Sequence, residues 1–310
     1  MRVVFMGTPE FAVPSLERLL ADRYEVVAVY TQPDQTAGRG RALSVPPVKA
    51  AALKWGVPVR QPVSLRSAAE RGGLAALQPD VAVVAAFGQI LTQAVLEIPP
   101  HGFLNIHPSL LPAYRGVAPV PAAILNGDEF TGVTVMQLDR GVDTGPVLLQ
   151  GQVPVAEHDT AASLMDKLAR VGAALLLEAL PRWADGRLAA RAQDDTKASY
   201  TRMIQKEAGE IDWTQPAVKI WRQVRAYCPW PGSWTRWQSK QIKVLEAVPL
   251  AGGGGTAGGV VPLEGGAGFG VETGQGILRV TRVQMEGKRA MTAGDFLRGQ
   301  RGIIGATLPG

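Results

Sequence analysis

Residues 103–116 of this 310-residue chain read Phe-Leu-Asn-Ile-His-Pro-Ser-Leu-Leu-Pro-Ala-Tyr-Arg-Gly. Just upstream, residues 80–87 read Asp-Val-Ala-Val-Val-Ala-Ala-Phe. This apolar run is typical of a strand buried on both faces of a parallel sheet. In the next strand candidate Asn105 and His107 are two residues apart, so both side chains point to one face. Pro108 ends that strand. An amide and an imidazole therefore stand where a strand gives way to a loop, the edge at which open α/β sheets bind ligands.

A carboxylate joins this pair further along the chain. Residues 138–145 read Leu-Asp-Arg-Gly-Val-Asp-Thr-Gly, which predicts a tight loop that presents Asp143. The amide of Asn105 is suited to hydrogen-bond a carbonyl oxygen on which negative charge develops. His107 can move a proton at neutral pH, and Asp143 can orient the imidazole or raise its basicity. No Ser or Cys lies in a nucleophile-elbow sequence, so we expect acyl or formyl transfer by direct attack of a substrate amine.

Each of these side chains also has a structural interpretation. His107 alone would suit a buried, hydrogen-bonded histidine, and Asn105 would suit a turn cap. Asp143 would close its loop through Thr144. Asp139 is the better candidate for a purely structural aspartate in that loop. The three residue types together favour a catalytic site over these separate roles.

Length and composition bound the class of protein. A chain of 310 residues predicts two domains. Cys228 is the only cysteine, which rules out an intramolecular disulfide and indicates a reducing compartment. One Cys and three His cannot build a zinc finger, and we expect no metal. The N-terminus shows neither a signal peptide nor a membrane span, so we expect a soluble, cytoplasmic protein.

Strands and helices alternate in the first part of the chain, which predicts an α/β domain over residues 1–186. It opens with a strand at 2–7, a helix at 11–20 and a strand at 25–30. No G-x-G-x-x-G follows the first strand, so a nicotinamide-dependent oxidoreductase is poorly supported. A long amphipathic helix at 160–184, with Thr160 as its cap, ends the domain.

The stretch at residues 31–49 is too long and too rich in Gly and Pro for an ordinary connection between a strand and a helix. Arg39 and Arg41 alternate with glycines, which allow the backbone to approach a ligand closely. The guanidinium fork of an arginine also matches the geometry of a phosphate, which makes a phosphate-bearing ligand one interpretation of this loop. The alternative is an ordinary surface loop.

The chain turns polar and aperiodic at residues 187–206, which predicts a linker. A second domain at 207–310 then begins with a helix at 217–226 and an aromatic turn at 228–234. Trp230 and Trp234 of that turn are expected in the core or at a domain interface. The remaining strands are short and separated by glycines, which indicates a small β-barrel; they are expected at 241–248, 259–262, 268–272 and 276–283.

The positive charge is unevenly distributed. The chain carries a net charge of +5, but residues 1–200 hold 18 Lys and Arg against 19 Asp and Glu. Residues 201–310 hold 14 against 8 and so contain the whole excess. A basic second part is typical of a protein with a polyanionic partner such as nucleic acid. A solvated surface that favours solubility explains the same charge on its own.

Five motifs spread over nearly the whole chain make it resemble the methionyl-tRNA formyltransferase family, within the 10-formyltetrahydrofolate-dependent formyltransferases. They are Val-Phe-Met-Gly-Thr-Pro-Glu-Phe at 4–11, Thr-Gln-Pro-Asp-x-x-Ala-Gly-Arg-Gly at 31–40, Asn105-x-His107-x-Ser-Leu-Leu-Pro, Asp139-x-Gly-x-Asp143-Thr-Gly, and Pro-Trp-Pro-x-Ser-Trp at 229–234. The third and fourth motifs mark the wider superfamily, whereas the arginine-glycine loop and the basic second domain favour the tRNA-dependent branch.

The resemblance implies a Rossmann-like catalytic domain followed by a small OB-like β-barrel that binds tRNA. The formyl group of 10-formyltetrahydrofolate would pass to the free α-amine of methionyl initiator tRNA. Asn105, His107 and Asp143 would be the catalytic residues, and Arg39 and Arg41 would reach the acceptor end of the tRNA. The folate would lie along Ser109, Leu110, Leu111 and Pro112, with its pterin ring against the backbone of Phe87, Gly88, Gln89, Ile90 and Leu91. Phe87 departs from the tyrosine expected in many relatives. We expect a monomer that needs no protein partner.

Two rival functions stay open. A formyltransferase that acts on a small sugar or nucleotide amine would need no tRNA and would tolerate a shortened loop at 31–49. A non-catalytic RNA-binding protein with a decayed enzyme domain would bind tRNA without turnover. The intact set of Asn105, His107 and Asp143 argues against that decay.

Overall fold

The computed structural model describes residues 1–37, 42–263 and 268–310. Their contacts divide the chain into two compact units. The first unit comprises Met1–Pro119, Phe130–Pro154 and Met165–Thr201, and the second comprises Val120–Glu129, Val155–Leu164 and Arg202–Gly310. The second unit therefore includes two short segments from the first part of the sequence, the excursions at 120–129 and 155–164. In the described part of the chain, no helix combines the length and apolar character needed to cross a membrane.

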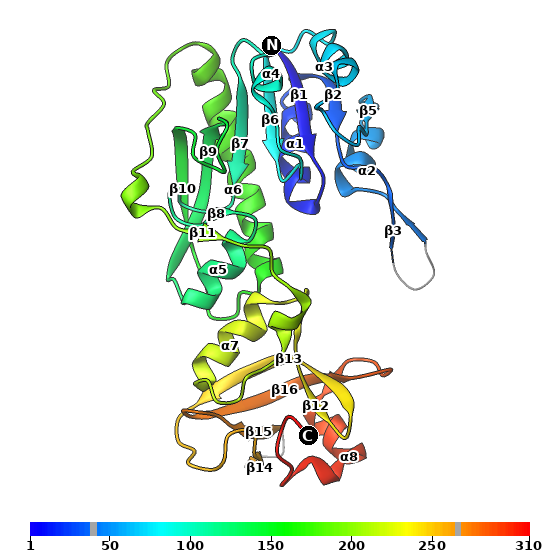
Figure 1. Cartoon of the computed structure of the whole chain (residues 1–310), viewed down its shortest axis with the longest axis vertical. Coiled ribbons are helices and arrows are strands. Elements are labelled where there is room, and N and C mark those ends of the chain that lie inside the picture. Colours follow the sequence, from blue (N-terminus) through cyan, green and yellow to red (C-terminus); the bar gives the residue numbers. More distant parts are fainter. Residues whose placement is uncertain (38–41, 264–267) are drawn as a thin grey trace. The chain divides into compact units, whose positions relative to one another are not determined.

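A seven-stranded sheet forms the centre of the first unit (Figure 1). Its spatial order is β10-β9-β7-β6-β1-β2-β5. The strands are β1 (Arg2–Gly7), β2 (Glu25–Tyr30), β5 (Val59–Arg60), β6 (Val81–Ala85), β7 (Phe103–His107), β9 (Phe130–Gln137) and β10 (Val147–Pro154). The five strands from β5 to β7 in this order are parallel to one another. The strand β9 is antiparallel to β7, and β10 is antiparallel to β9. The order reverses between β1 and β6, which is where doubly wound sheets bind ligands.

The buried strands follow from their sequence, because β6 and β7 bury every side chain between neighbours on both sides. The helices of this unit are α1 (Val13–Ala21), α2 (Pro47–Lys54), α3 (Ala68–Ala75), α4 (Gln93–Leu96) and α6 (Ala161–Ala184). A Cβ atom at Gly172 of α6 would lie 2.7 Å from Ile106. The helix therefore packs closely on β7 because this position is glycine. Thr160 accepts a bond from the Ser163 N–H at 3.2 Å, which confirms the expected cap.

The loop at residues 31–49 contains a short antiparallel hairpin, β3 (Gln35–Ala37) with β4 (Ala42–Ser44), drawn below α2 at the right of Figure 1. Arg39 and Arg41 lie outside the described residues. A polar cluster fixes the base of the hairpin: Lys49 Nζ lies 2.6 Å from the carboxylate of Asp34, and Gln61 bonds both side chains.

An antiparallel sheet forms the second unit, in the order β12-β13-β16-β15-β14, with β17 paired to β16. The sheet curls where the pairing of β13 with β16 shifts register between Val244 and Ala247. The α/β domain followed by this curled sheet confirms the predicted fold class. The strands of the second unit are β12 (Ser233–Trp237), β13 (Lys240–Leu250), β14 (Val260–Pro262), β15 (Phe269–Glu272), β16 (Ile277–Met285) and β17 (Met291–Thr292). Its helices are α5 (Pro119–Asn126), α7 (Ala217–Ala226) and α8 (Ala293–Gly299).

The core of the second unit holds one of the two expected tryptophans. Trp234 is buried in β12, but Trp230 is 58% exposed, so Trp230 is not in the core, which was one of the two positions expected for it. Arg225 of α7 stacks on the ring of Trp221 at 3.9 Å. Its guanidinium also donates to the carbonyls of Ala156, Glu157 and Asp159. This arginine therefore ties the excursion at 155–164 to α7.

The polar segment expected as a linker carries ordered structure. Arg191 forms a β-bridge with Val147, and a 3-10 turn follows at Asp195–Lys197. The strand β11 (Tyr200–Thr201) then pairs in parallel with β8 (Arg115–Gly116). Residues 191–201 thus pack on the first unit, against the segment that follows the Ser-Leu-Leu-Pro motif. The boundaries of the two domains stay a prediction.

Candidate active site

Asn105 and His107 occupy alternate positions at the carboxyl end of β7. Pairing with β6 on one side and β9 on the other holds this strand in the middle of the sheet. The two side chains share a face and are 8% and 4% exposed. Their hydrogen bonds are therefore made in a setting with little competing water.

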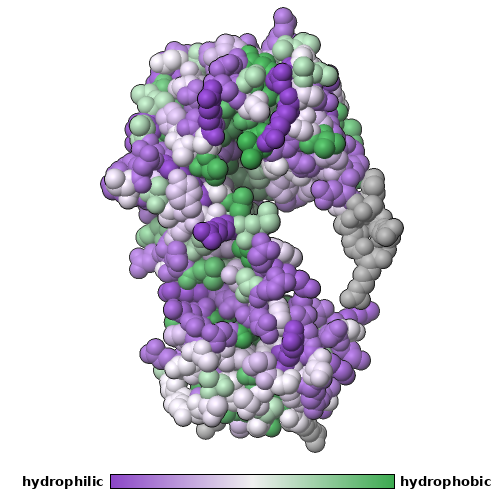
Figure 2. All heavy atoms as spheres, in the orientation of Figure 1, coloured by the Kyte–Doolittle hydropathy of each residue, from purple (hydrophilic) through white to green (hydrophobic). Residues whose placement is uncertain are grey.

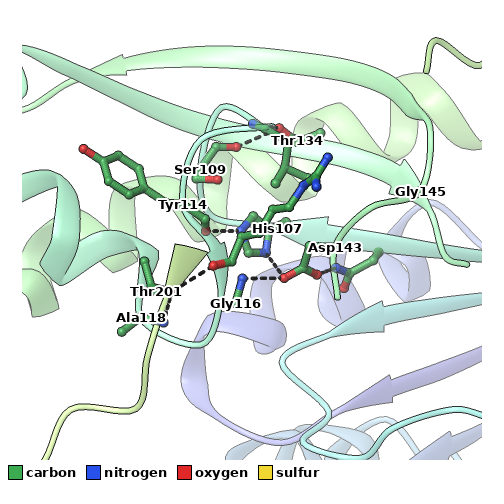
Figure 3. Close-up of polar contacts among 12 residues, drawn as sticks. His107, Ser109, Tyr114, Gly116, Ala118, Thr134, Asp143, Gly145 and Thr201 are labelled. Carbon is green, nitrogen blue, oxygen red and sulfur yellow. Dashed lines mark hydrogen bonds and ion pairs between the residues drawn. The ribbon is translucent and has the colours of Figure 1, made fainter. Parts of the chain in front are cut away.

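The imidazole of His107 is held from both sides (Figure 3). Its Nε2 lies 3.0 Å from the carbonyl oxygen of Tyr114, so Nε2 carries a proton and donates it. Its Nδ1 lies 3.6 Å from Oδ2 of Asp143 and is the nitrogen left to gain or lose a proton. Burial lowers the pKa of His107, while the charge of Asp143 and the carbonyl of Tyr114 act in the opposite direction. His107 is thus a neutral base at physiological pH whose protonated form Asp143 stabilises.

Asp143 contacts both Asn105 and His107 of β7. Its Oδ2 accepts the Gly116 N–H at 2.8 Å, and its Oδ1 lies 3.5 Å from Nδ2 of Asn105. Its backbone adopts φ +53°, a left-handed conformation that is uncommon for a residue with a Cβ. Thr144 bonds the carboxylate of Asp139 at 2.7 Å, so Asp139 closes the loop, as expected. Asp143 is left to face the imidazole.

The arrangement combines a hydrogen-bond donor, a base and an anion within one group of contacts. The amide nitrogen of Asn105 has two hydrogens, and only one can point along its contact with Asp143. The other is available to an oxygen that gains negative charge. His107 can accept a proton at Nδ1. Among the described residues, no group of three or more His, Cys, Asp and Glu is placed to hold a metal ion.

The segment at 109–112 is fixed mainly through its backbone. The hydroxyl of Thr134 donates to the Ser109 carbonyl at 2.7 Å and accepts the Leu111 N–H at 3.1 Å. Gln150 donates to the Leu111 carbonyl at 2.8 Å. The Ser109 hydroxyl itself donates to the carbonyl of Ala113 at 2.6 Å. This network holds the segment in one shape directly after His107.

The segment at 87–91 follows β6 and carries polar groups at the sheet edge. The ring of Phe87 is buried in the core, and its carbonyl accepts bonds from Thr8 and Gln32 at 3.1 Å each. Gln89 donates to the carbonyl of Pro62. Ile90 is 76% exposed. Gly88 and Ile90 are therefore the exposed members of this segment, whereas the phenyl ring of Phe87 is buried.

Sequence reasoning missed Arg115 and Gln193. Arg115 lies inside the opening motif but is 1% exposed, and Gln193 lies in the polar segment expected as a linker. The guanidinium of Arg115 donates to Oε1 of Gln193, whose amide contacts the loop of Asp143. The only signal in the sequence was a run of Arg, Gln and Asp without periodicity, which predicts no particular partner.

Comparison with known proteins decides the family. The profile of the formyl transferase family matches residues 1–180, and the profile of its C-terminal domain matches residues 203–301. The chain is 50% identical over 308 residues to a methionyl-tRNA formyltransferase of Dehalococcoides mccartyi, covering 99% of this chain and 98% of that protein. The chain belongs to the formyl transferase family, among the methionyl-tRNA formyltransferases.

Other relatives agree with this placement. A methionyl-tRNA formyltransferase of Marinobacter nauticus is 46% identical over 310 residues, covering 100% of this chain and 99% of that protein. Among solved structures, an N-formyltransferase of Helicobacter canadensis in complex with folinic acid and dTDP-3-aminofucose superposes with a TM-score of 0.68 at 21% identity, covering 90% of this chain and 98% of that one. The latter likeness shows the shared fold.

Proposed function

We propose that this protein transfers the formyl group of 10-formyltetrahydrofolate to the free α-amine of methionyl initiator tRNA. The observation that carries the proposal is the set of contacts that joins Asn105, His107 and Asp143 at the carboxyl end of β7. A donor, a base and an anion in contact suit transfer of a formyl group to an amine. The relatives that match the whole chain are methionyl-tRNA formyltransferases, which favours the charged tRNA as the amine.

In the proposed reaction, the amine nitrogen of methionine forms a bond to the formyl carbon. Asn105 donates a hydrogen bond to the formyl oxygen as it becomes negative. His107 accepts the proton that the attacking nitrogen loses, and Asp143 stabilises the resulting imidazolium. The bond from the formyl carbon to N10 of the folate then breaks, and that nitrogen takes up a proton from His107. The proton balance closes without a metal or a covalent enzyme intermediate.

The folate would lie along Ser109–Pro112 and against the backbone at 87–91. The ordered backbone at both segments supports this placement, because a rigid, preformed surface binds a flat ring at low entropic cost. Ile90, within the second of these segments, is an exposed apolar side chain. Figure 2 shows apolar side chains gathered within the polar surface of the first unit.

The second unit would bind the tRNA. It contains a surface cavity of about 360 Å³ along α7, and two of its lining residues are Lys219 and Arg222. Positive side chains on such a surface attract a phosphate backbone. Arg39 and Arg41 of the hairpin loop would reach the acceptor end. We further propose that the protein acts in the cytoplasm and that it is a monomer. Light scattering of the purified protein tests the oligomeric state.

A substrate panel tests the proposal. Formylation is followed with 10-formyltetrahydrofolate and methionyl initiator tRNA, and in parallel with free methionine, glycinamide ribonucleotide and an amino sugar nucleotide. Turnover is expected with the charged tRNA alone. Turnover with a small amine alone would support the rival function, and tRNA binding without turnover would support the decayed enzyme.

A further inference from the structure

The side-chain amide of Gln193 uses every hydrogen-bonding position that it has for the loop of Asp143 and for Arg115. Its Nε2 donates to the carbonyl of Asp143 at 2.8 Å and to that of Gly145 at 2.7 Å. Its Oε1 accepts from Nε and Nη2 of Arg115 at 3.1 and 2.9 Å. A reversed amide would set hydrogens against a guanidinium and an oxygen against two carbonyls, so the chemistry of the partners fixes its orientation.

Arg115 gives this amide a rigid support. Its guanidinium is buried and is held by the carboxylate of Asp195 at 2.7 Å and the hydroxyl of Tyr200 at 2.9 Å. The backbone on either side of Arg115 contacts the catalytic set directly. The Tyr114 carbonyl faces His107, and the Gly116 N–H donates to Asp143. The segment at 114–116 thus contacts the imidazole of His107 and the carboxylate of Asp143 directly, and it contacts the backbone of Asp143 through Gln193.

The backbone of Asp143 needs such support. Its φ of +53° is a conformation that a non-glycine residue keeps only when its surroundings hold it. The contact of Asp143 with Asn105 is long, at 3.5 Å, and its contact with His107 is 3.6 Å. The shorter bonds on this residue come from Gly116 to its side chain and from Gln193 to its carbonyl.

We infer that Gln193 is a positioning residue of the formyl-transfer site, which holds Asp143 at the distance from His107 and Asn105 that the reaction needs. The segment at 191–201, polar in sequence, is then part of the catalytic machinery and not a passive connection. The inference rests on the proposed function for its kinetic effect, but the geometry that it describes can be measured without turnover.

Two substitutions distinguish a role of Gln193 in positioning Asp143 from a role in the stability of the fold. Gln193→Glu keeps the size of the side chain and still accepts from Arg115, but sets an oxygen against two carbonyls. Arg115→Lys keeps a charge for Asp195 and loses the planar fork that holds Gln193. Gln152→Ala, an exposed glutamine on β10, is the matched control. Thermal unfolding of each variant identifies any that does not fold.

For both test variants, kcat is expected to fall by about 10- to 100-fold, because a displacement of about 1 Å costs that much. KM for both substrates is expected to stay within about twofold, since the loss falls on the transition state. A loss confined to KM, or wild-type kcat in a folded Gln193→Glu variant, would overturn the inference. An inactive wild-type protein would instead overturn the proposed function.

The second readout needs no substrate. The chain has three histidines, so NMR titration can follow His107 beside His101 and His158. Because the charge of Asp143 raises the pKa of His107 against burial, displacement of Asp143 is expected to lower that pKa in the Arg115→Lys variant, which keeps the net charge. Gln193→Glu adds a negative charge of its own beside the loop, so this readout uses Arg115→Lys alone. The Gln152→Ala variant is expected to leave the titration of His107 as in the wild type. An unchanged His107 titration in the folded Arg115→Lys variant would contradict the inference.

Discussion

The Asn105→Ala substitution isolates the hydrogen bond to the formyl oxygen. The backbone of Asn105 pairs with Val84 of β6 and Met136 of β9, so the strand should keep its place. Its side chain contacts Asp143 at only 3.5 Å, whereas Gly116 holds that carboxylate at 2.8 Å. The shorter bond dominates, so Asp143 should stay beside His107. The substitution therefore removes chiefly the hydrogen bond to the oxyanion that develops on the formyl oxygen. One such donor contributes about 2.7–4 kcal/mol, or about 10²- to 10³-fold in kcat.

The assay is steady-state formylation of methionyl initiator tRNA with each substrate varied in turn. Because the hydrogen bond strengthens only as the oxygen becomes charged, kcat is expected to fall while KM for the tRNA and for the folate changes by less than about twofold. Gln152→Ala serves as the control for an amide removed elsewhere. A kcat for Asn105→Ala within about threefold of the wild type would refute the oxyanion role, since a donor of this kind is worth far more.

Three further outcomes are expected. Asp143→Asn removes the charge that raises the pKa of His107 and leaves the lowering by burial, so the acidic limb of the pH–rate profile is expected to move to lower pH as kcat falls; an unmoved limb would contradict this. Arg225→Ala leaves three backbone carbonyls without their donor and is expected to cost about 3 kcal/mol of unfolding free energy by denaturant titration, with a loss below about 0.5 kcal/mol arguing against the tie. Lys219→Glu is expected to raise KM for the tRNA and flatten its salt dependence without changing KM for the folate, and an equal effect on both would disprove an RNA contact.

The sequence predicted the order of the two domains and the strand that carries Asn105 and His107. An unbroken apolar run followed by Asn105 and His107 at alternate positions is a local pattern, and local patterns determine strands. The contact of Asp143 with His107 spans a long stretch of chain. It was expected from the chemistry of the residue types and from the family resemblance, not from spacing.

Long-range contacts explain what sequence reasoning missed. Gln193 reaches Asp143 across 50 residues, and no periodicity marks such a contact. The polar segment at 191–201 reads as a linker because, beside one short 3-10 turn, its hydrogen bonds go to groups far away in the sequence, such as Val147, Arg115 and the loop of Asp143. Likewise, β12 was hidden in an aromatic, proline-rich stretch and becomes a strand only by pairing with β13. Trp230, at the start of that stretch, is exposed, which its residue type alone does not predict.

Transfer of an isotopically labelled formyl carbon tests the central claim most directly. Wild-type protein is mixed with labelled 10-formyltetrahydrofolate and methionyl initiator tRNA, and the amino acid is then released from the tRNA and identified by mass spectrometry. The account predicts labelled N-formylmethionine from the wild type and a far smaller yield from Asn105→Ala in the same reaction time. Unlabelled methionine after prolonged incubation with the folded wild-type protein would contradict it.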